Sequence, residues 1–273
     1  MIQDIAPSKL DNAYHAYVPG ADDFLMIFDP DGKLLVSSER DHLGFPTFAR
    51  ISSEKTVYLF SIDQDRFFLS LTDPVIPPAG FSYHTLRDLR ASYGGNAVFA
   101  AFTAFHLWEW YRDNSFCGKC GHSLHFHKVE RALECPSCGL IRYPRINPAV
   151  IVGVIKGDSL LLTRYNRGYA HNALVAGFTE IGETMEETVA REVMEETGVH
   201  VKNIRYYKSQ PWGIAQDILM GFYCDADGDE IIHVDRQELK YAEWVPRDEI
   251  VLQPDHLSLT NEMMMRFKEG KEC

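Results

Sequence analysis

The sequence predicts an α/β protein with three parts: a C-terminal α/β sandwich, a small metal-binding ribbon before it, and an α+β domain at the N-terminus. Three observations support this fold class. Strand-like and helical segments alternate after residue 143, two Cys-x-x-Cys pairs lie between residues 113 and 143, and the part before them reads as short strands followed by helices. We place the domain boundaries at residues 1–112, 113–143 and 144–273.

The composition is that of a globular protein, with 45% hydrophobic and 24% charged residues in 273. No apolar run approaches the ~20 residues needed to cross a bilayer, and the first residues lack the basic and apolar regions of a signal peptide. We therefore expect a cytoplasmic protein. The formal net charge of −12 disfavours broad contact with nucleic-acid phosphates, so a polyanionic substrate would need metal ions at the point of contact.

The N-terminal part is expected to contain two strand pairs and two helices. Residues 24–28 and 33–36 flank Asp29-Pro30-Asp31-Gly32, a pattern typical of a hairpin, and residues 57–60 and 67–69 form the second pair. Apolar residues at helical spacing predict helices over 83–90 and 97–112. The residue pattern assigns no chemistry to this part of the chain.

The ribbon carries four cysteines at the spacing of a structural zinc site: Cys117, Cys120, Cys135 and Cys138. Four thiolates close a tetrahedral shell and leave no position for water, so this zinc would be structural. The alternatives are free buried thiols or a redox pair. The histidines between the pairs, His122, His125 and His127, could compete as ligands.

The C-terminal part begins with a hairpin of residues 148–155 and 159–162, followed by a helix over 185–197. Further strands are expected near residues 204–207, 218–224 and 241–245, and a last helix runs through residues 263–265. On the first helix, Glu192 and Glu196 point the same way and border the buried face. Carboxylates crowded there need a hard cation, and oxygen ligands suit magnesium or manganese.

The alternative for this helix is a solvated acidic surface with ion pairs among Glu187, Arg191 and Glu195. That alternative does not explain the glycines. Gly177 and Gly182 bracket a loop that bends tightly into the helix, and Gly198 is a natural C-terminal stop.

The stretch from residue 177 to 199 resembles the Nudix box, G-x5-E-x7-R-E-U-x-E-E-x-G-U, in which U is aliphatic. Every specified position is met, by Gly177, Glu183, Arg191, Glu192, Val193, Glu195, Glu196, Gly198 and Val199. The resemblance implies an α/β/α Nudix fold with a mixed sheet, and hydrolysis of a nucleoside diphosphate linked to another moiety. It gives the catalytic metal to Glu192 and Glu196, an orienting role to Arg191 and Glu183, and proton acceptance to Glu195 or Glu196.

Three further features resemble the NADH pyrophosphatase (NAD-capped RNA decapping) branch of that family. They are the order of the three parts, the segment Tyr143-Pro144-Arg145-Ile146-Asn147-Pro148, and Ser209-Gln210-Pro211-Trp212, which matches the start of S-Q-P-W-P-F-P-x-S. The chain departs from that pattern where Gly213-Ile214-Ala215 replaces Pro-Phe-Pro and Asp217 replaces the last Ser. Because of this departure, the resemblance does not rank NADH, NAD, ADP-ribose and dinucleoside polyphosphates as substrates.

The branch resemblance implies further site residues. Phe178 and Tyr143 would sandwich the nicotinamide ring, with Tyr143 coming from the other subunit of a homodimer. The Ala176 carbonyl and Glu238 would be additional metal ligands. The other expected substrate contacts are Arg87, Gln210, Pro211, Trp212, Asp217 and Thr260.

The function expected from this resemblance is hydrolysis of NAD(H) to NMN(H) and AMP with magnesium or manganese, extending to removal of NAD caps from RNA. One alternative is a pyrophosphatase for ADP-ribose or another nucleoside diphosphate derivative. The other is a zinc-ribbon regulator that binds nucleic acid and senses a ligand through its Nudix domain. It requires basic surface and eroded glutamates, and this chain shows neither.

Overall fold

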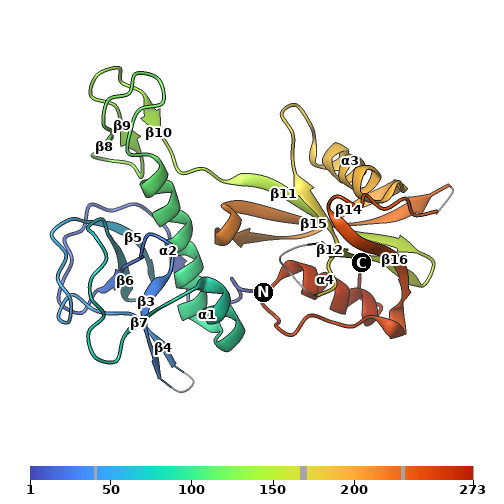
Figure 1. Ribbon diagram of the computed structural model, residues 1–273, viewed down its shortest axis with the longest axis horizontal. Coiled ribbons are helices and arrows are strands. Elements are labelled where there is room, and N and C mark those ends of the chain that lie inside the picture. The colour runs from blue at the N-terminus through green and yellow to red at the C-terminus, as the bar shows by residue number, and fades with distance from the viewer. Residues whose placement is uncertain (40–41, 167–170, 229–230, 273) are drawn as a thin grey trace. The chain divides into compact units, whose positions relative to one another are not determined.

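The computed structural model describes residues 1–39, 42–166, 171–228 and 231–272. The chain forms two compact units (Figure 1). Unit 1 contains Met1–Ile2, Ile146–Trp212 and Asp217–Cys273, and unit 2 contains Gln3–Arg145 together with Gly213–Gln216.

Unit 1 is built on a six-stranded sheet with the order β14-β15-β11-β12-β16, in which β13 also pairs with β11. Strands β11 and β15 are parallel, whereas the other pairs are antiparallel, so the sheet is mixed as predicted. The expected hairpin is confirmed by the pairing of Ile155 with Leu160. The strands are β11 (Asn147–Lys156), β12 (Ser159–Tyr165), β13 (Val175–Phe178), β14 (His200–Trp212), β15 (Asp217–Asp227) and β16 (Leu239–Pro246).

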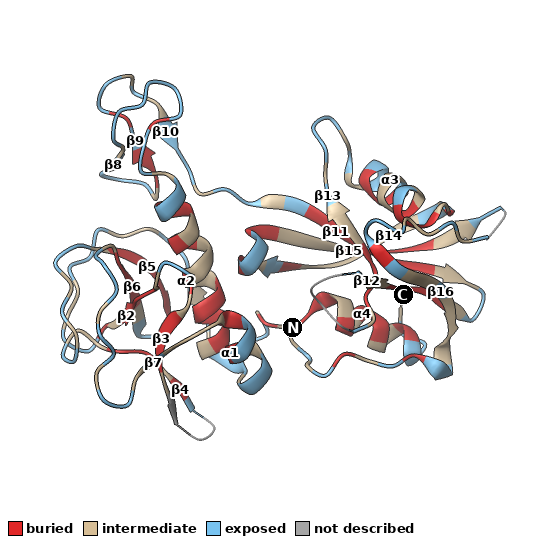
Figure 2. Cartoon of the chain, in the orientation of Figure 1, coloured by how far each residue is buried: buried red, intermediate tan, exposed pale blue. Residues whose placement is uncertain are grey.

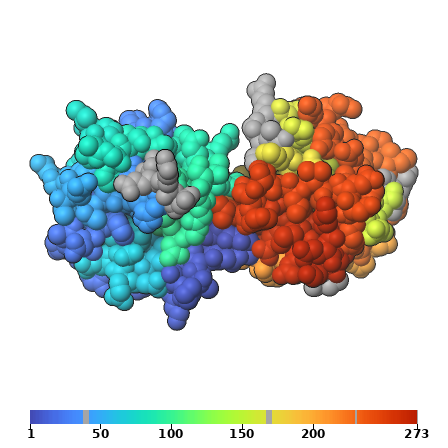
Figure 3. All heavy atoms as spheres, turned by 90° about the horizontal axis from the view of Figure 1, so that it is seen from below, coloured from blue at the N-terminus to red at the C-terminus, as the bar shows by residue number. Residues whose placement is uncertain are grey.

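Two helices cover opposite faces of this sheet (Figure 1). Helix α3 (Met185–Thr197) places Val189 and Val193 against the valines of β11, and helix α4 (Leu259–Lys268) packs on the other face through Met263 and Phe267. In Figure 3 the C-terminal residues, in red, form one face of unit 1. The short 3-10 helix η2 (Arg247–Glu249) lies between β16 and α4. This arrangement is the α/β/α sandwich that the sequence predicted.

Local sequence fixes both ends of α3. Thr184 accepts a hydrogen bond from the Glu187 backbone while the Glu187 side chain accepts one from Thr184, which is a capping box. At the other end Gly198 adopts φ 70°, a left-handed conformation that favours glycine. The helix therefore begins and ends where the motif requires, and this fixes the direction in which its glutamates point.

Unit 2 combines small sheets with two helices. One sheet has the order β1-β5-β6-β2 and another the order β4-β3-β7. Helix α2 (Gly95–Asp113) has buried stretches along its length (Figure 2), and its buried residues include Phe99, Phe102 and Leu107. The first sheet contains β1 (Leu10–Asp11), β2 (Phe24–Met26), β5 (Thr56–Ile62) and β6 (Asp65–Ser70). The second contains β3 (Leu34–Glu39), β4 (His42–Gly44) and β7 (Ser82–His84), and α1 (Leu86–Ser92) precedes α2. Three short strands, β8 (His125–Phe126), β9 (Leu133–Glu134) and β10 (Ile141–Arg142), form the ribbon.

Two predictions in unit 2 were wrong in detail. The segments flanking Asp29-Pro30-Asp31-Gly32 turn back as expected, but they share one bridge, Phe28 with Leu34, and their strands pair elsewhere: β2 with β6, and β3 with β4 and β7. The helix expected from residue 83 begins at Leu86, because residues 82–84 pair with β3 and the Thr85 side chain caps the helix. In both cases pairing with strands distant in sequence overrode the local pattern.

Candidate active site

The first element of the site is a close approach between strand β13 and helix α3. A Cβ atom added to Gly177 would lie 2.0 Å from Cδ of Glu192 and about as close to both carboxylate oxygens. Any side chain at this position would occupy the space of the carboxylate, so glycine lets the Glu192 carboxylate lie directly against β13. Gly177 and Glu192, two specified positions of the motif, are thus in direct contact.

Arg191 organises the loop that leads into α3. Its Nε donates to Glu183 Oε1 at 2.5 Å, Nη1 donates to Glu192 Oε1 at 2.8 Å and to Glu195 Oε2 at 3.1 Å, and Nη2 donates to the Phe178 carbonyl at 2.9 Å. Glu183 also accepts hydrogen bonds from Thr188 and from the Glu180 backbone. These bonds, led by the one from Arg191, lower the pKa of Glu183 to about 2, so it stays a carboxylate.

Glu196 is the buried member of the acidic set. It is 3% exposed, its Oε2 has no hydrogen-bond partner among the described residues, and its carboxylate receives a hydrogen bond from the Ala176 backbone N–H. Burial first, then the negative charges of Glu192 and Glu238, raise the pKa of Glu196 to about 8. Burial likewise raises the pKa of Glu192.

Tyr165, at the end of β12, belongs to the same neighbourhood, although nothing in the sequence pattern singled it out. Burial raises its pKa, and so do the charges of Glu196, Glu238 and Glu192. Glu238 is exposed in the turn before β16, and its carbonyl accepts a hydrogen bond from the Asn166 backbone. Three predicted ligands, Glu192, Glu196 and Glu238, are therefore close enough to interact electrostatically.

These residues fit a hard divalent cation. A buried, unpartnered carboxylate oxygen next to two further carboxylates is unfavourable unless a positive charge compensates it. Their ligand atoms do not form a tight cluster: within the described part of the chain, the four cysteines are the only group of three or more such residues whose ligand atoms all lie within 4.8 Å of one another. One oxygen of Glu192 accepts a hydrogen bond from Arg191.

The four cysteines of the ribbon form the second candidate metal centre. Cys117 Sγ lies 3.6 Å from Cys138 Sγ, and Cys120 Sγ lies 3.4 Å from Cys135 Sγ. Sulfurs bound at about 2.3 Å around a tetrahedral zinc are about 3.8 Å apart, close to this spacing. The donor set and its geometry fit zinc. His122 and His125 are exposed on the ribbon and lie outside this cluster.

Several predicted substrate residues gather at one end of the unit 1 sheet, on the face that α4 covers. Trp212 pairs with Asp217, Asp217 pairs with Asn147, and Phe178 pairs with Ala149 two residues further along β11. Phe178 is 50% exposed. Thr260 is half-buried in the first turn of α4, and Pro211 is exposed.

Asp217 is buried at this sheet end. It is 5% exposed, its Oδ1 finds no hydrogen-bond partner among the described residues, and burial raises its pKa to about 7. Gln210 is fully buried and links β14 to α4: its Nε2 donates to the Leu257 carbonyl and its Oε1 accepts from the Leu259 backbone. The structure thus gives Gln210 a packing role, and its contact with substrate stays a prediction.

Two predicted substrate residues belong to unit 2. Arg87 is exposed on α1. Tyr143 is 55% exposed, and its hydroxyl donates to Glu130 Oε2 at 3.0 Å, a partner that sequence analysis did not identify. The sandwich of Tyr143 and Phe178 around a base stays a prediction.

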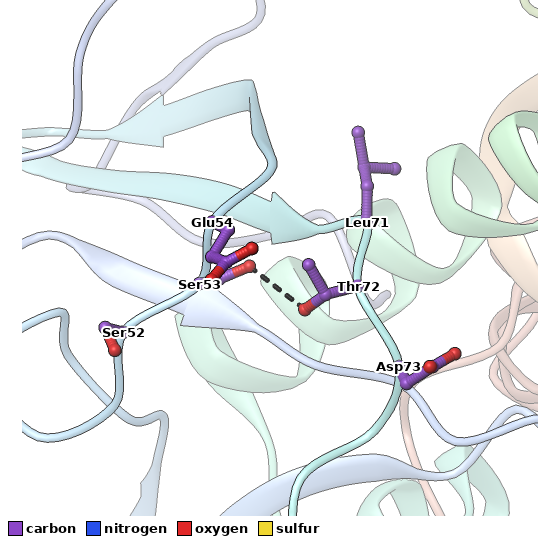
Figure 4. Close-up of a pocket in the computed structure, with 6 residues that line it drawn as sticks. All are labelled: Ser52, Ser53, Glu54, Leu71, Thr72 and Asp73. Carbon is purple, nitrogen blue, oxygen red and sulfur yellow. Dashed lines mark hydrogen bonds between the residues drawn. The ribbon is translucent and has the colours of Figure 1, made fainter.

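Unit 2 also carries a shallow, open depression lined by Ser52, Ser53, Glu54, Leu71, Thr72 and Asp73 (Figure 4). The Ser53 and Thr72 hydroxyls lie 3.2 Å apart there. No predicted site residue lines it.

Comparison with known proteins agrees with this geometry. The model of the NUDIX domain matches residues 145–267. The chain is 48% identical over 151 residues to the NAD-capped RNA hydrolase NudC of Klebsiella pneumoniae (strain 342) and 46% identical over 150 residues to that of Enterobacter sp. (strain 638). Each match covers 54% of this chain, and 58% and 57% of the respective relatives.

Among solved structures, a NUDIX hydrolase from Nitrosomonas europaea superposes with a TM-score of 0.51 at 22% identity, covering 57% of this chain and 92% of that one. This likeness supports the fold alone. Within the described residues, no helix is both long and apolar enough to span a membrane. Helix α3 with its glutamates lies within residues 145–267, the part of the chain that matches the NUDIX domain.

Proposed function

We propose that the protein is a metal-dependent hydrolase that cleaves the diphosphate of NAD(H) into NMN(H) and AMP. The observation that carries the proposal is Glu196, a buried carboxylate with an unpartnered oxygen beside Glu192 and Glu238. The substrate class is supported by relatives named NAD-capped RNA hydrolases, which extends the proposal to NAD caps on RNA.

Magnesium or manganese held by Glu192, Glu196, Glu238 and the Ala176 carbonyl would neutralise the diphosphate oxygens and lower the pKa of the attacking water. Arg191 keeps Glu192 in place and ties α3 to the Phe178 carbonyl. Glu195 or Glu196 accepts the proton of the water. Glu195 is the more accessible of the two, with its side chain 62% exposed.

Substrate recognition is assigned to the sheet end that carries Phe178, Trp212 and Asp217. Phe178 offers an exposed ring face for stacking on nicotinamide, and Tyr143 from a partner subunit of a homodimer supplies the opposite face. The cysteine cluster binds zinc in a structural role.

The second candidate is a pyrophosphatase for ADP-ribose. It is considered because Gly213-Ile214-Ala215 departs from the Pro-Phe-Pro pattern of the NADH pyrophosphatase branch. The test is to compare kcat/KM of the purified protein, with magnesium or manganese, for NADH, NAD, ADP-ribose, dinucleoside polyphosphates and NAD-capped RNA. NADH or NAD-capped RNA should give the highest value. A higher kcat/KM for ADP-ribose than for every NAD derivative would replace the proposal with this second candidate.

A further inference from the structure

The loop between β14 and β15 has an unusual place in the fold. Both strands belong to unit 1 and meet through the pair Trp212 and Asp217, yet the residues between them, Gly213–Gln216, belong to unit 2. The short 3-10 helix η1 (Gly213–Ala215) packs there against α2. This is the loop in which the chain departs from the Pro-Phe-Pro pattern.

Gly213 makes the first contact. A Cβ atom at this position would lie 2.1 Å from the Phe102 carbonyl oxygen and 2.8 Å from its carbon. Those are helix backbone atoms, which cannot rotate away as a flexible side chain can. Only glycine allows this approach to α2. The replacement of proline by glycine in the loop thus has a specific consequence: it lets the loop lie against the helix backbone.

Gln216 makes the second contact. It is 4% exposed. Its backbone has φ 54°, a left-handed conformation that residues other than glycine seldom adopt. Its Oε1 accepts hydrogen bonds from Arg145 Nε at 3.2 Å and Nη2 at 2.8 Å, and its Nε2 donates to Glu109 Oε2 at 2.7 Å. Two charged residues of unit 2 therefore bind the two ends of one buried amide.

The partners of Gln216 are themselves held in place. Arg112 Nη2 lies 3.3 Å from Glu109 Oε1, so the carboxylate of Glu109 is shared between an arginine and Gln216. The Arg145 carbonyl is 2.7 Å from Nε2 of His106, one helical turn from Glu109 on α2. Hydrogen bonds to charged groups away from water are among the stronger ones, so this network can fix the loop that contains η1.

We propose that Glu109 and Arg145 act through Gln216 as positioning residues for substrate binding. They hold the loop that joins Trp212 to Asp217, and so set the position of the two residues assigned to the substrate at the sheet end. This inference rests on the proposed function. The contacts that carry it, from Gly213 and Gln216 to Phe102, Glu109 and Arg145, all lie within unit 2.

The test is a paired substitution. Gln216→Glu places a carboxylate against that of Glu109, and adding Glu109→Gln restores an amide–carboxylate pair with the roles exchanged. The single variant should raise KM for NADH about tenfold, with little change in kcat, and the double variant should recover most of the loss. Gln64→Glu, exposed on unit 2, is the matched control for the added charge and should behave as wild type.

Amide hydrogen exchange of residues 213–217 gives a readout that does not depend on activity. It should be faster in Gln216→Glu and slower again in the double variant. Unchanged exchange in Gln216→Glu, an unchanged KM, or a loss that Glu109→Gln does not rescue would overturn the inference. If the wild type does not hydrolyse NADH but exchange follows the expected pattern, the anchoring holds and the proposed function fails.

Discussion

A Cβ atom at position 177 would lie 2.0 Å from Cδ of Glu192, so the glycine of β13 and the glutamate of α3 are fitted to each other. Gly177→Ala should displace this carboxylate and lower kcat at least about tenfold, as expected when a metal ligand moves. Steady-state kinetics at saturating metal would measure it. Gly94→Ala, which has open space around its Cβ, is the control. Full activity in Gly177→Ala would remove Glu192 from the site.

Much of this site could be predicted from the sequence, because the chemistry of α3 depends on local spacing. The bounds of α3 and the place of Glu196 at its buried face follow from a contiguous motif, whereas the contact between Gly177 and Glu192 is seen only in the structure. The roles of Tyr165 and Glu130 could not be predicted, since each depends on a contact with a residue distant in sequence. The same is true of the partners of β2 and β3, which lie far along the chain.

Asp217 should make stability depend on pH. Its pKa is raised from 3.8 to about 7 in the folded protein, so folding favours the neutral acid. The cost of burying the charge is absent below pH 4, grows as pH rises from about 4 to 7, and is complete above that range. Asp217→Asn should therefore raise the free energy of unfolding by on the order of 3 kcal/mol at pH 8 and leave it almost unchanged at pH 4. Urea unfolding at both pH values measures this difference. Equal effects at both would show that Asp217 is not buried as an acid.

The cysteine cluster should contain about one zinc per chain after purification without added metal, because closed thiolate sites bind zinc tightly. Cys135→Ser should lose the metal and lower Tm by more than about 5 °C. Elemental analysis and calorimetry would measure both quantities. His125→Ala, on the exposed part of the ribbon, should keep its zinc. A metal-free wild-type protein would contradict the assignment.

A substitution at Phe178 can distinguish recognition of the nicotinamide ring from hydrolysis of the diphosphate. The residue is 50% exposed, so Phe178→Ala removes a stacking surface without opening the core. Losing roughly 1 kcal/mol of stacking should raise KM for NADH several-fold and change KM for ADP-ribose much less, because ADP-ribose lacks the nicotinamide ring. Equal losses on both substrates would mean that Phe178 supports the loop without contacting the base.

The most direct test of the proposed activity is the product of NADH hydrolysis by the wild type and by Glu196→Gln, measured by mass spectrometry with magnesium or manganese present. The account predicts NMNH and AMP in equal amounts from the wild type. It predicts a rate at least about a hundredfold lower from Glu196→Gln, which removes a metal-binding charge at constant size. Glu186→Gln, exposed in the first turn of the same helix, should keep the wild-type rate. No NMNH from the wild type, or a Glu196→Gln variant as active as Glu186→Gln, would contradict it.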